Sequence, residues 1–232
     1  MFFFDPMYLL FALPGLLLAL WAQAKVKSTF SKYSQVPTSR QVNGLQTAQI
    51  LMRNNGLMGI SVQGTRGQLT DFYDPRSKTI NLSDSSTQNS IASVAVVAHE
   101  LGHAQQDAEN YAPLKLRGAI VPAVQVGGWV GPILFFIGIL IGITQLAWLG
   151  VIAFGLTTIF ALITLPVELN ASSRAMHMLK SSNILVGDDL VGARKMLDAA
   201  ALTYVAAALQ SILTMLYYVM LLTGMGGRRR GL

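Results

Sequence analysis

The chain has 232 residues, of which 52% are hydrophobic and only 12% are charged, whereas soluble domains carry about 25% charged residues. This composition, with apolar residues gathered in long runs, indicates a membrane protein with several spans and one small extramembrane unit. The chain has no cysteine, which excludes disulfides and thiolate metal sites, so any metal must be held by His, Asp or Glu. The net charge of +6 is expected to set membrane topology. Without a stacked-aromatic basic patch, no nucleic-acid partner is expected.

The first predicted element is an uncharged span over residues 7–24, which is long enough to cross a bilayer. Its end, Ala22-Gln23-Ala24, also resembles a signal-peptide cleavage site. However, the preceding residues include Asp5 and no Lys or Arg, which favours an uncleaved helix. Three lysines follow at positions 25, 27 and 32. The positive-inside rule therefore predicts an external N-terminus and a cytoplasmic second segment.

That second segment, residues 25–117, is polar, and its pattern of turns and short apolar runs predicts a small α+β unit. Its first helix is expected to have Thr38 or Ser39 as N-cap and Gly56 as C-cap. Three strands are expected at residues 57–63, 68–74 and 79–83, the first two around the turn GTRG. Polar residues then precede a helix from about Ser90 to Glu109.

The following 49 residues without a charge, 119–167, are too long for one span and fit two. The break is expected near Thr144 and Gln145. A last uncharged stretch covers residues 199–223, and the arginines at 228–230 after it disagree with a four-span topology under the positive-inside rule. Either this stretch does not cross, or the rule fails at that end.

The predicted fold is thus a mainly α membrane protein, with about four transmembrane helices and a small α+β unit carrying the motif described below. The predicted segments are a first span (1–24), the zincin-like unit (25–117), a transmembrane hairpin (118–167), a short polar segment (168–198), and a last span with a basic tail (199–232).

The motif is His99-Glu100-Leu101-Gly102-His103, the pattern H-E-x-x-H. Histidines four residues apart lie on one face of a helix, so both can reach one Zn²⁺ ion. Glu100 can then act as general base on a zinc-activated water and pass the proton to the leaving amine. The alternative is an interior helix with paired polar groups. The small residues Ala98 and Gly102 and the placement of two of the three histidines at this spacing favour zinc.

A catalytic zinc needs three protein ligands and one open position. Glu168 is the preferred third ligand, because two spans separate it from His103 and an even number returns the chain to the same side. His177 is the other candidate, and is more typical of an ordinary helix residue. Asp107 and Glu109 are expected to be solvated at the end of the motif helix. Asn170 and Ser172 are candidates for hydrogen bonding to the ligands.

The chain resembles the YugP-type membrane zinc metallopeptidases of bacteria, which are gluzincin-like. The similar stretches occur in the family's order: LTDFYDPRSKTINLS, SIASVAVVAHELGHAQQ, APLKLRGAIVPAV, LPVELNASSRA and DAAALTYVAAALQSIL. The resemblance implies peptide hydrolysis, with His99 and His103 as ligands, Glu100 as acid/base and Glu168 as third ligand. One departure is Phe72, where similar proteins often have His, and this weakens any required role for that position.

The resemblance also implies that an extended substrate adds to a sheet edge beside the motif helix. The strand before that helix is the expected edge, with Thr79, Ile80 and Asn81 lining the cleft. The oxyanion donor is unassigned among Tyr73, Arg174 and His177.

The expected function is a zinc endopeptidase, with one Zn²⁺ per chain and protein or peptide substrates, in the bacterial plasma membrane with its site at the cytoplasmic face. An intramembrane protease is less favoured, because the apolar run before His99 has only about eight residues. A non-catalytic, zinc-stabilised scaffold would need a fourth protein ligand. Homo-oligomers and membrane partner proteins are possible, since small-residue patches such as GGWVG can pack helices within or between chains.

Overall fold

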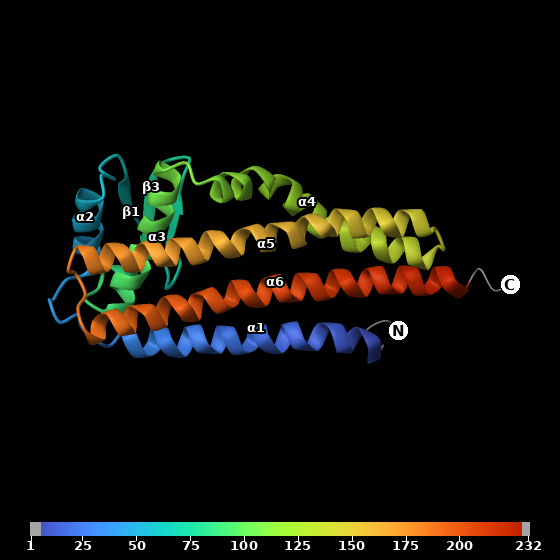
Figure 1. Ribbon diagram of the computed structural model, residues 1–232, viewed down its shortest axis with the longest axis horizontal. Helices are drawn as coiled ribbons and strands as arrows, with labels where there is room; N and C mark the ends of the chain where they lie inside the picture. Colours follow the sequence, from blue (N-terminus) through green and yellow to red (C-terminus); the bar gives the residue numbers. More distant parts are fainter. Residues whose placement is uncertain (1–5, 229–232) are drawn as a thin grey trace. The chain divides into compact units, whose positions relative to one another are not determined.

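Four helices of the computed structural model, which describes residues 6–228, are long and apolar enough to cross a membrane (Figure 1). They are α1 (Pro6–Tyr33), α4 (Ala112–Leu140), α5 (Thr144–Ser181) and α6 (Asp188–Arg228). The predicted break between the middle spans is confirmed, because α4 ends at Leu140 and a turn with Gly142 at φ +75° precedes α5. The protein is therefore a mainly α membrane protein. Asp5 and the tail arginines 229 and 230 lie outside the described residues.

The chain forms two compact units, which are described separately here. The first consists of residues 1–21, 116–165 and 203–232, and the second of residues 22–115 and 166–202. Helices α1, α4, α5 and α6 each run through one of the predicted segment limits. These limits therefore mark changes of polarity along continuous helices.

In the first unit, α4 and α5 pack through facing glycines. A Cβ added to Gly131 would lie 2.7 Å from the backbone nitrogen of Phe154, and one added to Gly150 would lie 2.4 Å from that of Phe135. Such close approach of backbones is typical of membrane helices. Gly131 closes the predicted small-residue patch, which thus packs within the chain. Phe135 stacks on Tyr218 of α6, with ring centroids 4.0 Å apart.

In the second unit, the small α+β part contains α2 (Gly44–Asn54), a three-stranded sheet, a short 3-10 turn and α3 (Ile91–Ala108) (Figure 1). The strands are β1 (Ser61–Thr65), β2 (Phe72–Asp74) and β3 (Thr79–Ser83). The sheet order is β1-β3-β2, with β1 parallel and β2 antiparallel to β3. The strands on either side of the turn GTRG therefore flank β3 and are not a hairpin.

The predicted N-cap of α2 was wrong, and its C-cap is Asn55, one residue before the predicted Gly56, which follows in a left-handed conformation (φ +69°). The polar cap expected before α3 was confirmed. Asn43 caps α2: its side chain accepts from the Gln46 backbone N–H, while the Gln46 side chain accepts from the Asn43 N–H. This capping box satisfies two backbone donors at once. The Thr38 hydroxyl instead bonds the loop before the helix, donating to the carbonyl of Val42. For α3, Ser90 is the N-cap and accepts from the Ser93 N–H.

The core of the second unit lies between the sheet, α3 and the polar ends of α5 and α6. It joins buried side chains from all of these elements, among them Leu51, Ile80, Val94, Leu101, Met178, Leu179 and Met196. Strand β3 is buried along most of its length, which explains its central place in the sheet. The motif helix is thus held on one side by the sheet and on the other by α5.

Candidate metal centre and active site

The motif residues lie on α3, within the second unit. His99 and His103 project from the same face of the helix, and their ring centroids are 4.8 Å apart. Both imidazoles are mostly buried, with 15% and 12% of their side chains exposed. An alanine- and valine-rich helix therefore presents two imidazoles to one buried point.

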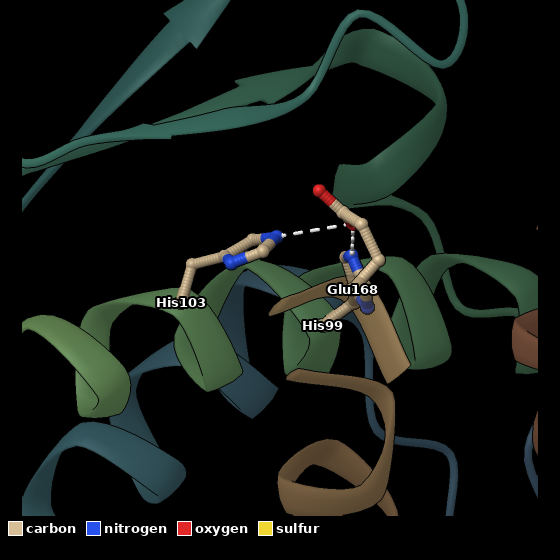
Figure 2. A group of neighbouring side chains, drawn as sticks. All are labelled: His99, His103 and Glu168. Atoms are coloured by element: carbon tan, nitrogen blue, oxygen red, sulfur yellow. Dashed lines mark hydrogen bonds and ion pairs between the residues drawn. The ribbon is translucent and has the colours of Figure 1, made fainter. Parts of the chain in front are cut away.

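Glu168 reaches this point from α5 and is only 2% exposed. Its Oε2 atom lies 3.2 Å from His99 Nε2 and 3.4 Å from His103 Nε2 (Figure 2). Gly102 makes this contact possible, because a Cβ at that position would lie 2.4 Å from the carbonyl oxygen of Ala171. The glycine inside the motif thus lets α3 rest directly on the backbone of α5, one turn beyond Glu168.

The three side chains fit a zinc ion. One ligand atom from each of His99, His103 and Glu168 lies within 4.8 Å of the other two. Ligands bound tetrahedrally at 2.0–2.1 Å are separated by about 3.3 Å, which agrees with the 3.2 and 3.4 Å separations found here. Among residues 6–228 this group has three donors. Three donors leave a fourth tetrahedral position open.

Gln106 orients His103 and was not foreseen from the sequence. This side chain is fully buried, and its Oε1 lies 3.0 Å from His103 Nδ1. Its Nε2 donates to the carbonyl of Val167 at 2.8 Å and to Asn170 Oδ1 at 2.9 Å. The amide nitrogen thereby faces α5, so Oε1 can only accept from His103, which leaves His103 Nε2 free as a ligand atom. Gln106 follows His103 by three residues, so helical spacing could have revealed it.

Of the two predicted supporting residues, one contacts a histidine directly. The Ser172 Oγ lies 3.2 Å from His99 Nδ1 and can accept its proton when Nε2 binds a metal. Asn170 acts one step further out, through Gln106. It also accepts a hydrogen bond of 2.7 Å from the Arg174 Nε, and Arg174 pairs with Glu109.

Glu100 faces the strand β2. It is 8% exposed, and its Oε2 accepts a hydrogen bond of 2.9 Å from the backbone N–H of Tyr73. In turn, the Tyr73 hydroxyl donates to Asp107 at 2.6 Å, and Lys78 pairs with the same carboxylate. The expectation that Asp107 is solvated was therefore wrong, because it is mostly buried and bonded to Lys78 and Tyr73. Glu109 is half exposed, as expected, and pairs with Arg174.

The predicted oxyanion donors are engaged elsewhere. Burial, the hydrogen bond to Asp107 and the negative charges of Asp107 and Asp74 all raise the pKa of Tyr73, so the phenol stays protonated with its hydrogen on Asp107. Arg174 is bonded to Asn170 and Glu109. His177 lines a cavity between α5 and α6 that also reaches Ser172.

The predicted substrate edge was also wrong. Thr79, Ile80 and Asn81 belong to β3, which is hydrogen-bonded on both sides, to β1 and to β2. A central strand has no free backbone groups with which an added strand could pair. The sheet edge beside α3 is instead β2, as the bond from Tyr73 to Glu100 shows.

Comparison with known proteins places this geometry in a family. Residues 8–223 match the family described as "Putative neutral zinc metallopeptidase". The chain belongs to this family. It is also 44% identical over 216 residues to "Putative membrane protease YugP" of Bacillus subtilis (strain 168), covering 93% of this chain and 96% of that protein. No solved structure matches it significantly. The resemblance read from the sequence is thereby confirmed at the level of the family.

Proposed function

We propose that this family member is a zinc-dependent endopeptidase that binds one Zn²⁺ through His99, His103 and Glu168. The observation that carries the proposal is the convergence of three buried donors from α3 and α5 at zinc-ligand spacing. A zinc ion held there would act as a Lewis acid, polarising a substrate carbonyl and making a water easier to deprotonate.

The chain's own residues would perform the proton transfers. Tyr73 holds one oxygen of Glu100 through its backbone N–H, which leaves Oε1 of the carboxylate available as base. Glu100 would take a proton from the attacking water and deliver it to the nitrogen of the leaving amine. Gln106 and Ser172 keep the two imidazoles oriented throughout, because they bond the nitrogens that face away from Glu168.

An extended peptide would bind along the outer edge of β2. This strand pairs with β3 on one side, and its other side faces Glu100, which already binds the Tyr73 N–H. Main-chain pairing at such an edge holds a peptide with little demand on its sequence. The substrates would therefore be proteins or peptides in an extended conformation.

We place the site at the cytoplasmic face of the bacterial plasma membrane. Every lysine of the chain lies in the unit that holds the motif, and lysines accumulate on the cytoplasmic side. Helix α3 is not among the candidate spans of the described residues, which disfavours an intramembrane protease. A structural zinc site would be closed by four protein ligands, which disfavours a scaffold.

Zinc content and cleavage of an unstructured peptide, both measured on detergent-purified full-length protein, test the proposal. Wild type should hold one zinc and cleave. Glu100→Gln should keep the zinc and lose about 10²-fold or more in rate, and Glu168→Ala should lose the zinc. Asp84→Asn, a matched change at an exposed carboxylate, should behave as wild type. Full activity in Glu100→Gln would refute the mechanism, and full zinc in Glu168→Ala would refute the ligand set.

A further inference from the structure

A cavity of about 520 Å³ lies between the polar ends of α5 and α6 in the second unit. Its volume is in the range of small-molecule sites. The side chains that matter here are Leu169, His177 and Lys180 from α5, and Arg194, Leu197 and Ala201 from α6. None of these six residues is a zinc donor or one of the hydrogen-bond partners described above, although Ser172, which bonds His99, also lines the cavity.

The charged groups of this cavity favour an anion. Lys180 and Arg194 are permanent cations, and His177 adds further hydrogen-bond donors. Within residues 6–228, neither Lys180 nor Arg194 makes an ion pair with a carboxylate. Asp198 also lines the cavity, so the permanent charge remains positive by one unit. Unpaired basic groups converging on a cavity suit a phosphate group.

The cavity also offers apolar surface, because half of its lining residues are apolar: Leu169, Met176, Leu190, Val191, Leu197 and Ala201. Leu169 lies about 16 Å from Lys180 along α5, and Ala201 about 10 Å from Arg194 along α6, at 1.5 Å per residue. In both helices the end that carries Leu169 or Ala201 is the one that continues into the candidate membrane span. The two cations therefore lie farther from the spans than Leu169 and Ala201, with apolar side chains along the whole cavity, since Leu190 and Val191 lie beyond Arg194. Asp198 lies on the span side of Arg194.

We propose that this cavity binds an anionic phospholipid. Arg194 and Lys180 would hold the headgroup phosphate, and the beginning of an acyl chain would lie along Leu169, Leu197 and Ala201. Basic pockets between helices that enter a membrane commonly recognise anionic lipid headgroups. A free phosphate would leave the apolar lining uncovered, and a zwitterionic lipid would bring a third positive charge beside the two cations.

The experiment uses full-length protein in a neutral, non-ionic detergent. Binding of dihexanoyl phosphatidylglycerol is measured by calorimetry, with dihexanoyl phosphatidylcholine and glycerol 3-phosphate as comparators. We expect saturable binding of the anionic lipid, and at least tenfold weaker binding of both comparators. The double variant Lys180→Ala/Arg194→Ala should bind the anionic lipid at least roughly tenfold more weakly.

The matched control is Lys27→Ala/Lys195→Ala, which removes the same charge from exposed residues that do not line this cavity. It should bind as wild type. Ala201→Phe should fill the part of the cavity nearest the spans, and should therefore weaken binding of the lipid but not of glycerol 3-phosphate. The exchange Lys180→Arg/Arg194→Lys keeps both charges and should retain lipid binding. Retained binding would show that the double alanine variant loses affinity through loss of charge and not through misfolding.

Three results would overturn the proposal. An equal loss of lipid affinity in Lys180→Ala/Arg194→Ala and in Lys27→Ala/Lys195→Ala would show that binding depends on overall charge and not on this cavity. Glycerol 3-phosphate binding as tightly as the lipid would make the cavity a site for free anions. Phosphatidylcholine binding as tightly would reduce it to an apolar groove without a role for the cations.

Discussion

Gln106 determines which nitrogen of His103 is available to a metal. Its amide donates to the backbone of α5 and to Asn170, so its oxygen must accept from His103 Nδ1. Partners of this kind typically contribute 10- to 100-fold to metal affinity. We therefore expect Gln106→Ala to weaken zinc binding by about that factor, as measured by competition with a chromogenic chelator.

Gln105→Ala is the control for this prediction, because Gln105 lies beside it on the same helix and is only partly buried. It should leave zinc affinity unchanged. If Gln106→Ala melts at a lower temperature yet binds zinc as tightly as the control, the residue serves packing alone.

His103 should make the metal-free protein sensitive to pH. Burial disfavours its charged form, but the hydrogen bond to Glu168 and the charges of Glu100 and Glu168 outweigh burial and raise the pKa of His103. Because the pKa is raised in the folded state, protonated His103 stabilises the fold. This contribution is fully present when the pH is below the ordinary pKa of about 6.5, and it is lost as the pH rises through the raised pKa.

Zinc requires the neutral imidazole, so its affinity should change in the opposite sense and fall as the pH drops through the same range. We expect the melting temperature of EDTA-treated protein to decrease above about pH 6.5, and His103→Gln to lack this decrease. Identical pH profiles of the two metal-free proteins would contradict the prediction.

Residue spacing in the sequence was sufficient to predict how part of the candidate site is arranged. His99 and His103 share one helix face, as the i, i+4 pattern requires, and counting spans put Glu168 on the same side of the membrane, where it groups with them. What spacing could not give are the partners that other elements contribute. The bond from Tyr73 to Glu100 depends on how β2 lies over α3, and no local pattern encodes that.

At the scale of elements, Gly102 controls how closely α3 approaches α5. An added Cβ would lie 2.4 Å from the Ala171 carbonyl oxygen, so Gly102→Ala must push the helices apart. Overpacking of this kind costs about 1–3 kcal/mol, and the same displacement would separate Glu168 from the histidines. We expect a lower melting temperature together with reduced zinc content.

Gly118→Ala is the matched control, since no atom lies within 4 Å of a Cβ added there. It should be neutral or slightly stabilising, because alanine favours a helix. Normal zinc content in Gly102→Ala would mean that α3 and α5 can separate without opening the site.

The strands show the limit of what a sequence pattern predicts. The third strand lies where it was expected, whereas the first two begin four residues later than expected. Their pairing was not predicted, since nothing in a five-residue strand states which neighbour it takes. Burial supplies the missing information: β3 is buried almost throughout and takes the centre, whereas β1 and β2 are more exposed and take the edges. The sequence does not indicate this burial, because Ile80 and Leu82 alternate with polar residues, as is typical of a strand with only one covered face.

At the scale of the whole molecule, the proposed site requires the chain to cross the membrane twice between His103 and Glu168. The two candidate spans α4 and α5 provide these crossings. The unit containing the motif and the turn after α4 should therefore lie on opposite sides of the membrane. The chain has no cysteine of its own, so single introduced cysteines can report each side.

We expect Arg66→Cys and Ser181→Cys, both at exposed positions of the motif unit, to react with an impermeant maleimide only after the cells are opened. Ile141→Cys, in the exposed turn between α4 and α5, should react in intact cells. The two motif-unit positions must in any case agree with each other, because Glu168 and the histidines meet on one side. Labelling of Arg66→Cys and Ser181→Cys from different sides would make a shared metal site impossible. Agreement between them, but from the outside, would keep the site and reverse only the proposed orientation, because the lysines would then not have followed the positive-inside rule.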